Sequence, residues 1–278
     1  MTTAVMGVVN VTPDSFFDGG RYFDAFAAIA HGEALVAEGA DILDVGGEST
    51  RPGADPVDAA EELRRVIPVV TALARSVRVS IDTMKPSVAV AAIDAGATLV
   101  NDVAGTLAPV VAREGVGLVV MHMRGVPKTM QERPRYDDVV AEVHRWLDQA
   151  AKMARNLGVQ EIYVDPGIGF GKTTAHNLAL LSALPTLVAT GEKVLVGTSR
   201  KAFLGALSAS RPGEVASAED RFEASVASAV YAMTCGVAMV RVHDVAACVD
   251  ASRLVAATSG ALSLAEILER APLVEGAG

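Results

Sequence analysis

The chain of 278 residues carries a net charge of −9 at pH 7, and 51% of its residues are apolar while only 4% are aromatic. An acidic chain without runs of like charge argues against nucleic acid as the main partner, because nucleic-acid-binding surfaces are basic. No segment reaches the length of about 20 apolar residues that a membrane span needs. The two cysteines, Cys235 and Cys248, and the lack of a signal-peptide pattern favour a reduced, cytoplasmic protein.

Eight apolar segments of strand length recur along the chain, and a helical segment follows each of them. Segments that are apolar on both faces are typical of parallel strands covered on both sides. The predicted strands lie at 4–10, 41–46, 77–82, 98–101, 117–122, 161–165, 193–199 and 238–243. The predicted helices lie at about 24–38, 58–74, 86 onward, 107–113 and 136–156, then one ending near 189, one starting near 200, one ending near 234, and one at 245–257; a short helical tail is predicted at 262–270.

Eight strand–helix units in a chain of this length predict a (β/α)8 TIM barrel, which typically has about 250 residues. The alternative is a doubly wound open sheet. We favour the barrel, as one domain over residues 1–278, because no linker or change in composition divides the chain and because polar residues follow every predicted strand.

Those polar residues are the main functional signal. One such residue is more often a helix cap than part of a site, but eight sets together indicate an active site, because the carboxyl ends of barrel strands meet on one face. The residues concerned are Asn10, Asp44 with Glu48, Asp82, Asn101 with Asp102, His122, Asp165, Ser199 to Lys201, and Arg241 with His243.

Residues 161–173 combine a strand that ends at Asp165 with three alternating glycines, which let a ligand approach the backbone closely. The ending Gly-Phe-Gly-Lys-Thr is not a P-loop, since that motif needs a glycine where Pro166 stands, and the glycine spacing also departs from the dinucleotide-binding pattern. We therefore expect Lys172→Ala to matter much less than Asp165→Ala.

The predicted mouth of the barrel divides into two chemical halves. Acids and amides suit the N–H donors of an aminopyrimidine edge, and flat or apolar groups suit its ring faces. Clustered basic groups indicate a phosphate or diphosphate, beside which an amide oxygen suits Mg²⁺. The first half contains Asp82, Asn101, Asp165, Met121 and Phe170; the second contains Asn10, Arg51, Lys201, Arg241 and His243.

Seven motifs, in order along almost the whole chain, resemble those of dihydropteroate synthase. They are Asn10-Val-Thr-Pro-Asp-Ser-Phe, Gly46-Gly-Glu-Ser-Thr-Arg-Pro-Gly, Ser80-Ile-Asp-Thr, Asn101-Asp, Asp165-Pro-Gly-Ile-Gly-Phe, Thr198-Ser-Arg-Lys and Arg241-Val-His-Asp. The resemblance implies a homodimeric (β/α)8 barrel that condenses (7,8-dihydropterin-6-yl)methyl diphosphate with 4-aminobenzoate in folate biosynthesis. It also implies that sulfonamides, which mimic aminobenzoate, inhibit competitively.

The resemblance implies a role for each matching residue. The pterin would be bound by Asp82, Asn101, Asp165 and Lys201, with Met121 packing nearby. The diphosphate would be bound by Arg241 and His243, and Mg²⁺ would be held by Asn10. Thr50 would contact the pterin diphosphate from its loop. The aminobenzoate site would include Phe16, Arg51, Pro52 and Phe170. The residues implied to be catalytic are Asp82, Lys201, Arg241 and His243.

Two positions depart from the family pattern, and two other functions compete. Ala202 stands where many relatives carry a serine that contacts the aminobenzoate carboxylate, and Phe17 replaces a small residue, so we expect a quantitative effect on aminobenzoate affinity.

A pterin-binding methyltransferase of the same barrel type would share the acids and amides, and a non-catalytic paralogue would share the fold. The basic motifs around Arg51, Lys201 and Arg241 favour the synthase over both.

Overall fold

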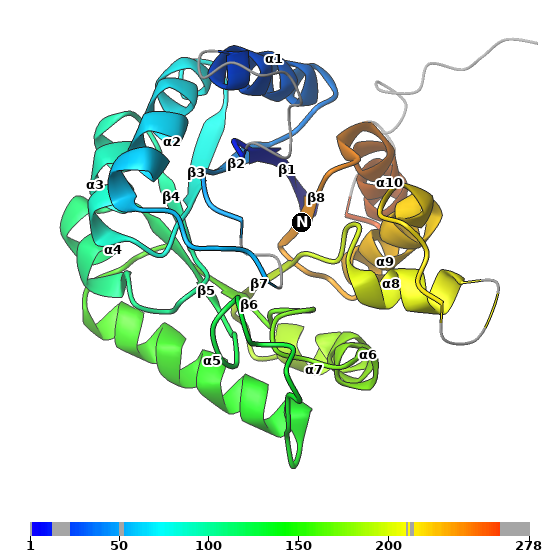
Figure 1. The fold of residues 1–278 in the computed structure, drawn as a ribbon. Helices are drawn as coiled ribbons and strands as arrows, with labels where there is room; N and C mark the ends of the chain where they lie inside the picture. The colour runs from blue at the N-terminus through cyan, green and yellow to red at the C-terminus, as the bar shows by residue number, and fades with distance from the viewer. Residues whose placement is uncertain (1, 13–22, 50–52, 210, 212–213, 262–278) are drawn as a thin grey trace, which may run out of the picture.

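The computed structural model describes residues 2–12, 23–49, 53–209, 211 and 214–261. Eight parallel strands close into a barrel in sequence order, with β1 paired to both β2 and β8 (Figure 1). The strands are β1 (Ala4–Asn10), β2 (Ile42–Gly46), β3 (Arg78–Asp82), β4 (Leu99–Asp102), β5 (Gly117–Met121), β6 (Ile162–Asp165), β7 (Lys193–Val196) and β8 (Met239–Val242). The predicted (β/α)8 fold is confirmed.

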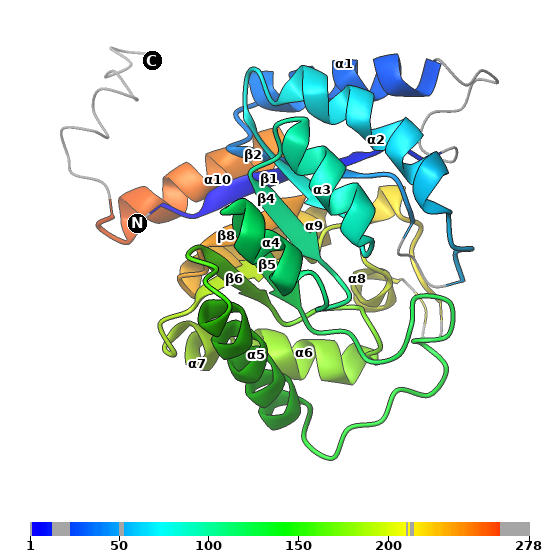
Figure 2. The same cartoon turned by 90° about the vertical axis from the view of Figure 1, so that its left-hand side faces the viewer.

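Helices surround the barrel, as the two perpendicular views show (Figures 1 and 2). They are α1 (Phe23–Ala37), α2 (Ala59–Leu73), α3 (Pro86–Asp94), α4 (Ala108–Glu114), α5 (Val139–Asn156), α6 (Thr174–Ser182), α7 (Leu184–Val188), α8 (Ala202–Ser208), the 3₁₀ helix η1 (Glu219–Arg221), α9 (Phe222–Thr234) and α10 (Val245–Thr258). Of the helices described, none combines the length and the apolar character that a membrane crossing demands.

Helix boundaries follow local capping chemistry. Asp58 caps α2 by accepting a hydrogen bond from the backbone N–H of Glu61 at 2.8 Å. Asp138 caps α5 in the same way, so this helix begins three residues later than the prediction of 136. The single helix predicted to end near 189 is instead two helices, because Pro185 in the first turn of α7 has no N–H to continue α6. The predicted tail helix at 262–270 lies outside the described residues.

Two layers fill the inside of the barrel. The lower layer is apolar and contains Met6, Ile42, Leu99, Val119, Tyr163, Leu195 and Met239. Strand side chains alternate between the two faces, so the residues two positions further along β2, β4, β6 and β8 also face inward. Those residues are Asp44, Asn101, Asp165 and Arg241. A polar layer therefore lies directly above an apolar one, at the carboxyl end of the strands.

Candidate active site

Four strands contribute side chains to one polar cluster at the centre of the barrel mouth. Arg241 on β8 donates from Nε to Asp44 Oδ2 on β2 at 2.6 Å, and from Nη2 to Asp82 Oδ2 on β3 at 2.9 Å. Asn101 on β4 donates from Nδ2 to the same Asp44 oxygen at 2.9 Å. We call these four residues the central cluster. It joins residues up to 197 positions apart in the sequence, so it forms only when the barrel closes.

The central cluster has unused acceptor capacity. Within the described residues, Asp44 Oδ1, Asp82 Oδ1 and Asn101 Oδ1 are buried and have no hydrogen-bond partner. A buried polar atom without a partner costs about 1–3 kcal/mol, so three such atoms side by side favour a ligand that brings N–H donors. The amino and ring N–H groups of an aminopyrimidine have that character.

Burial controls the charges of the central cluster. The pKa of Asp82 is raised to about 7, because loss of hydration and, to a smaller extent, the neighbouring carboxylate of Asp44 together outweigh the lowering effect of the Arg241 guanidinium. The pKa of Arg241 is raised, because the attraction of Asp44 and Asp82 outweighs the effect of burial. Arg241 is therefore a permanent cation, while Asp82 changes charge near neutral pH.

The opposite wall of the mouth is made by β6, β7 and the loops that follow them. Asp165 accepts a hydrogen bond from the Gly167 backbone N–H at 2.7 Å, and burial raises its pKa. Lys201 donates to the carbonyl oxygen of Ile168, and its Nζ lies 4.6 Å from the centroid of the Phe170 ring. Burial lowers the pKa of Lys201 to about 8. An acid, a cation and an aromatic face thus adjoin one another.

His243 follows β8 and lies on the same side of the mouth as Arg241. Its Nδ1 is 3.0 Å from Ser199 Oγ, and its backbone N–H donates to the same hydroxyl at 3.2 Å. Ser199 belongs to the segment after β7, so its hydroxyl fixes the position of the imidazole relative to the neighbouring strand. Arg241 and His243 give this side of the mouth its basic character, and Lys201 adds a cation from the opposite wall.

The described site residues predicted from the sequence all lie at the carboxyl end of the barrel. Met121 ends β5 and pairs with Asp165 in the strand register, as Asp82 pairs with Asn101. Asn10 ends β1 and is half-buried. Phe16, Thr50, Arg51 and Pro52, together with Phe17, lie outside the described residues.

Asp44 is a member of the central cluster to which the family resemblance assigns no role. The sequence marks it only as one of the polar strand ends, whereas in the structure it is fully buried between Arg241 and Asn101. Strand alternation is the signal that could have found it, since Ile42 belongs to the inner apolar layer and Asp44 is two residues further along β2.

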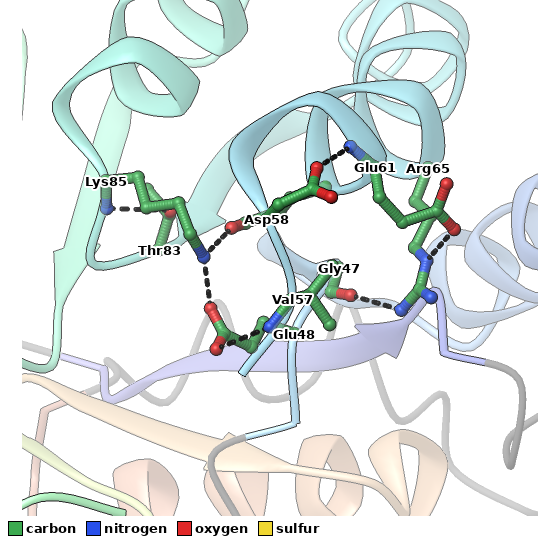
Figure 3. A network of polar contacts seen from close by, with 9 residues as sticks. Gly47, Glu48, Val57, Asp58, Glu61, Arg65, Thr83 and Lys85 are labelled. Carbon is green, nitrogen blue, oxygen red and sulfur yellow. Dashed lines mark hydrogen bonds and ion pairs between the residues drawn. The ribbon is translucent and has the colours of Figure 1, made fainter. Parts of the chain in front are cut away.

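The loop after β2, which includes residues 50–52, is fastened at both ends. Figure 3 shows Glu48 accepting the backbone N–H of Val57 at 3.2 Å while also bonding Lys85, which precedes α3. The Lys85 ammonium forms a second ion pair, with Glu62 on α2, and the Glu62 side chain is fully buried. Arg65 adds a hydrogen bond to the Gly47 carbonyl oxygen at 2.9 Å. Residues 49–56 therefore start and finish at positions fixed by the neighbouring helices.

A hollow of about 540 Å³ between α9 and α10 is not part of this site. It lies at the amino-terminal end of the strands, where Thr3, Gly236 and Ser252 contribute to its wall. The residues that line it carry no charge, so it lacks the charged side chains found at the carboxyl end.

Comparison with known proteins identifies the family. Residues 6–243 match the family described as "Pterin binding enzyme". The dihydropteroate synthase of Mycobacterium leprae is 50% identical to this chain over an alignment of 262 positions, and the alignment covers 91% of this chain and 92% of the relative. The chain belongs to the dihydropteroate synthase family.

Solved structures of other dihydropteroate synthases have the same fold. The Xanthomonas albilineans enzyme, solved with 4-aminobenzoic acid, has a TM-score of 0.85 and 47% identity, covering 93% of each chain. The Yersinia pestis enzyme, solved in a sulfonamide drug complex, has a TM-score of 0.85 and 40% identity, covering 93% of this chain and 95% of its own. The match to dihydropteroate synthases therefore extends over nearly the whole barrel.

Proposed function

We propose that this chain uses the central cluster and the basic side of the mouth to condense (7,8-dihydropterin-6-yl)methyl diphosphate with 4-aminobenzoate. The products are 7,8-dihydropteroate and diphosphate, in folate biosynthesis. The single observation that carries the assignment is the set of buried acceptor atoms on Asp44, Asp82 and Asn101 that have no partner among the described residues, in a cluster held by the Arg241 guanidinium. A donor-rich heterocycle fits the acceptors, and its anionic substituent fits the cations.

The pterin lies across the mouth in this proposal. Asp82, Asn101 and Asp165 accept hydrogen bonds from its amino and ring N–H groups, while Met121 packs nearby. Lys201 donates to an acceptor of the pterin, in addition to its bond with the Ile168 carbonyl. The ring fills a space bounded by charged and aromatic groups from several strands, so its methylene carbon is directed toward Arg241 and His243.

The reaction exchanges one bond at that methylene carbon. The bond from carbon to the diphosphate oxygen breaks, its electron pair leaves with the diphosphate, and the electron-rich ring delocalises the remaining positive charge. The Asp82 carboxylate stabilises that cation, and Arg241 with His243 stabilises the leaving anion. The aminobenzoate nitrogen then bonds to the carbon and loses a proton. No side-chain nucleophile takes part.

Asn10 is the proposed protein ligand of Mg²⁺. Its side chain ends β1 at the mouth and makes no hydrogen bond to the described residues, and its amide oxygen is a hard donor of the kind this ion prefers. The described residues contain no group of three acidic, histidine or cysteine ligands, so the substrate diphosphate and water would supply the other ligands. When bound, Mg²⁺ would neutralise charge that develops on the leaving diphosphate.

The aminobenzoate site is proposed to lie above the pterin, between Phe170 and the loops that carry Phe16, Arg51 and Pro52. The Phe170 ring is held against the Lys201 ammonium.

A turnover assay with the purified protein tests the proposed function. We expect release of one diphosphate per dihydropteroate formed, only when both substrates and Mg²⁺ are present. A protein that binds the pterin diphosphate but forms no dihydropteroate would be the non-catalytic paralogue. Methyl transfer from methyltetrahydrofolate under the same conditions would instead support the methyltransferase.

We propose a homodimer formed by the late helices. Large apolar side chains are exposed there: Phe222 and Tyr231 on α9 are 45% and 42% exposed, and Leu254 on α10 is 66% exposed. Exposed apolar groups on adjacent helices are typical of a subunit interface. Light scattering should give twice the chain mass, and Leu254→Asp should shift the protein toward the monomer.

A cytoplasmic location is proposed from the cysteines. Cys235 and Cys248 are both free thiols, and burial raises the pKa of Cys248 to about 11. Free thiols persist in reducing compartments. Cell fractionation tests the location.

A further inference from the structure

The glycine-rich loop after β6 packs directly against the backbone that follows β5. Gly167 and Gly171 have φ angles of +65° and +61°, a region that side chains disfavour. A Cβ atom at Gly167 would lie 1.9 Å from the carbonyl oxygen of His122, and one at Gly171 would lie 2.3 Å from that of Arg124. The two backbone segments are therefore too close for any side chain between them.

Lys172 fastens these two segments together. Its side chain is only 3% exposed and turns back under the loop. Its Nζ donates to the carbonyl oxygens of His122 at 3.2 Å and of Phe170 at 3.0 Å, and it lies 3.0 Å from His122 Nδ1. An ammonium has three N–H donors, and here three acceptors meet it, as a buried cation requires.

The fastened loop holds three groups of the pterin site. Its Gly167 N–H bonds Asp165, its Ile168 carbonyl accepts from Lys201, and its Phe170 ring lies beside the Lys201 ammonium. On the outer side, Gly169 N–H donates to Asn177 of α6 at 2.8 Å. A shift of this loop would move an acid, a cation and an aromatic ring of the mouth at once.

We propose that Lys172 is a positioning residue of the pterin site, holding the loop at 166–171 on β5 so that Asp165, Lys201 and Phe170 keep their places. This inference rests on the proposed function of that site. It replaces the expectation that substitution of Lys172 has little effect. The proposed role of Lys172 is structural and does not include binding a nucleotide phosphate. Its buried ammonium faces backbone carbonyls, and no anion can reach it without displacing them.

The same contact fixes the state of His122. Burial lowers the pKa of Lys172 to about 7, and wherever its ammonium donates to Nδ1, the imidazole is neutral with its proton on Nε2. Burial, followed by the positive charges of Lys172 and Arg124, lowers the pKa of His122 to about 3, with Glu142 opposing. The edge of the ring meets Trp146, with centroids 5.3 Å apart, and Trp146 is the only tryptophan of the chain.

The first test compares Lys172→Met, which keeps the aliphatic stem and removes the ammonium, with Lys152→Met. Lys152 is an exposed lysine paired with Asp148 on α5, so its replacement is a matched control. Calorimetric titration with the pterin diphosphate should show at least tenfold weaker binding for Lys172→Met and unchanged binding for Lys152→Met. Pterin affinity within twofold of the unmodified protein would overturn the positioning role, even if the melting temperature fell.

The second test uses the fluorescence of Trp146, which a protonated imidazole at contact distance quenches. Removing the Lys172 charge raises the pKa of His122, so acid quenching should begin at a higher pH in Lys172→Met than in the unmodified protein. Superimposable titration curves for the two proteins would overturn the assignment of the Lys172–His122 contact.

The third test uses only the unmodified protein, so it can be carried out even if Lys172→Met fails to fold. At pH 6, which lies below the lowered pKa of Lys172 and above that of His122, the nitrogen NMR shifts of His122 in the unmodified protein should show an unprotonated Nδ1 and a protonated Nε2. A proton on Nδ1 would overturn the inference. Turnover measured beside these tests separates the two proposals. Turnover by the unmodified protein together with unweakened pterin binding by Lys172→Met refutes the positioning role alone, whereas absence of turnover in the unmodified protein refutes the proposed function.

Discussion

At the scale of single residues, the central cluster is held together by Arg241. Its guanidinium pairs with the carboxylates of Asp44 and Asp82 and donates a hydrogen bond to one oxygen of each. Asp44 is fully buried, and removing the partner of a buried ion pair leaves an uncompensated charge, which costs about 3–5 kcal/mol. Arg241 therefore serves both the fold and the anion site.

Arg241→Ala should lower both turnover and stability. Loss of a donor that stabilises the leaving diphosphate should reduce kcat/KM for the pterin substrate by about 3 kcal/mol, roughly two orders of magnitude. Urea unfolding should show a lower midpoint, because Asp44 and Asp82 lose their counter-ion. Arg155→Ala, which removes an exposed arginine of α5, serves as control. An unchanged kcat/KM in Arg241→Ala would refute the assignment.

Asp82 should give the enzyme an acidic limb in its pH–rate profile. Its pKa is raised to about 7 by burial, so below that pH the carboxyl becomes neutral and can no longer stabilise a cation. We expect kcat/KM for the pterin substrate to fall as the pH decreases through about 7, since kcat/KM reports the free enzyme.

Asp82→Asn is the control for this limb. It should be slow at every pH and should lack the acidic limb. If the limb persists at the same pH in Asp82→Asn, another group is responsible.

At the scale of elements, the sequence alone was sufficient to predict the positions of the strands and the end of the barrel that carries the site. Buried parallel strands produce continuous apolar segments, and the polar residue after each one identifies its carboxyl end. The sequence could not predict contacts between elements, such as the pairing of Asp44 with Arg241, because local patterns do not show which strands meet across a barrel. The burial of Lys172 was missed for the same reason, because its partner His122 belongs to another strand–helix unit.

The ion network around Lys85 is such a contact between elements, and it predicts a stability effect. Lys85→Met should lower the free energy of unfolding by about 3–5 kcal/mol, because the Glu62 carboxylate is fully buried and would lose its counter-ion. Urea unfolding measures the change. The double variant Lys85→Met/Glu62→Gln should recover part of the loss, because the uncompensated charge is gone. Losses that simply add in the double variant would contradict the pairing.

At the scale of the whole molecule, the barrel is closed at one end and open at the other. The inner apolar layer blocks passage below the polar layer, so both substrates and both products must use the carboxyl-end mouth. A molecule bound above the pterin, in the proposed aminobenzoate site, therefore competes directly with aminobenzoate.

Sulfonamides should accordingly inhibit by competing with aminobenzoate. Raising the aminobenzoate concentration should restore turnover at a fixed sulfonamide concentration, while raising the pterin diphosphate should not. Steady-state kinetics with each substrate varied in turn provides the measurement. Inhibition that aminobenzoate does not relieve would place the drug elsewhere.

The backbone contact beneath the glycine loop also limits how this protein can evolve under selection. Every amino acid that a single-base change in a glycine codon can introduce carries a Cβ, and at positions 167 and 171 that atom would overlap a carbonyl oxygen. Neither position can therefore supply a viable escape variant against a compound that lies on this loop. In a saturation library grown under such a compound, we expect these two codons to remain glycine among the survivors, while exposed loop positions diversify.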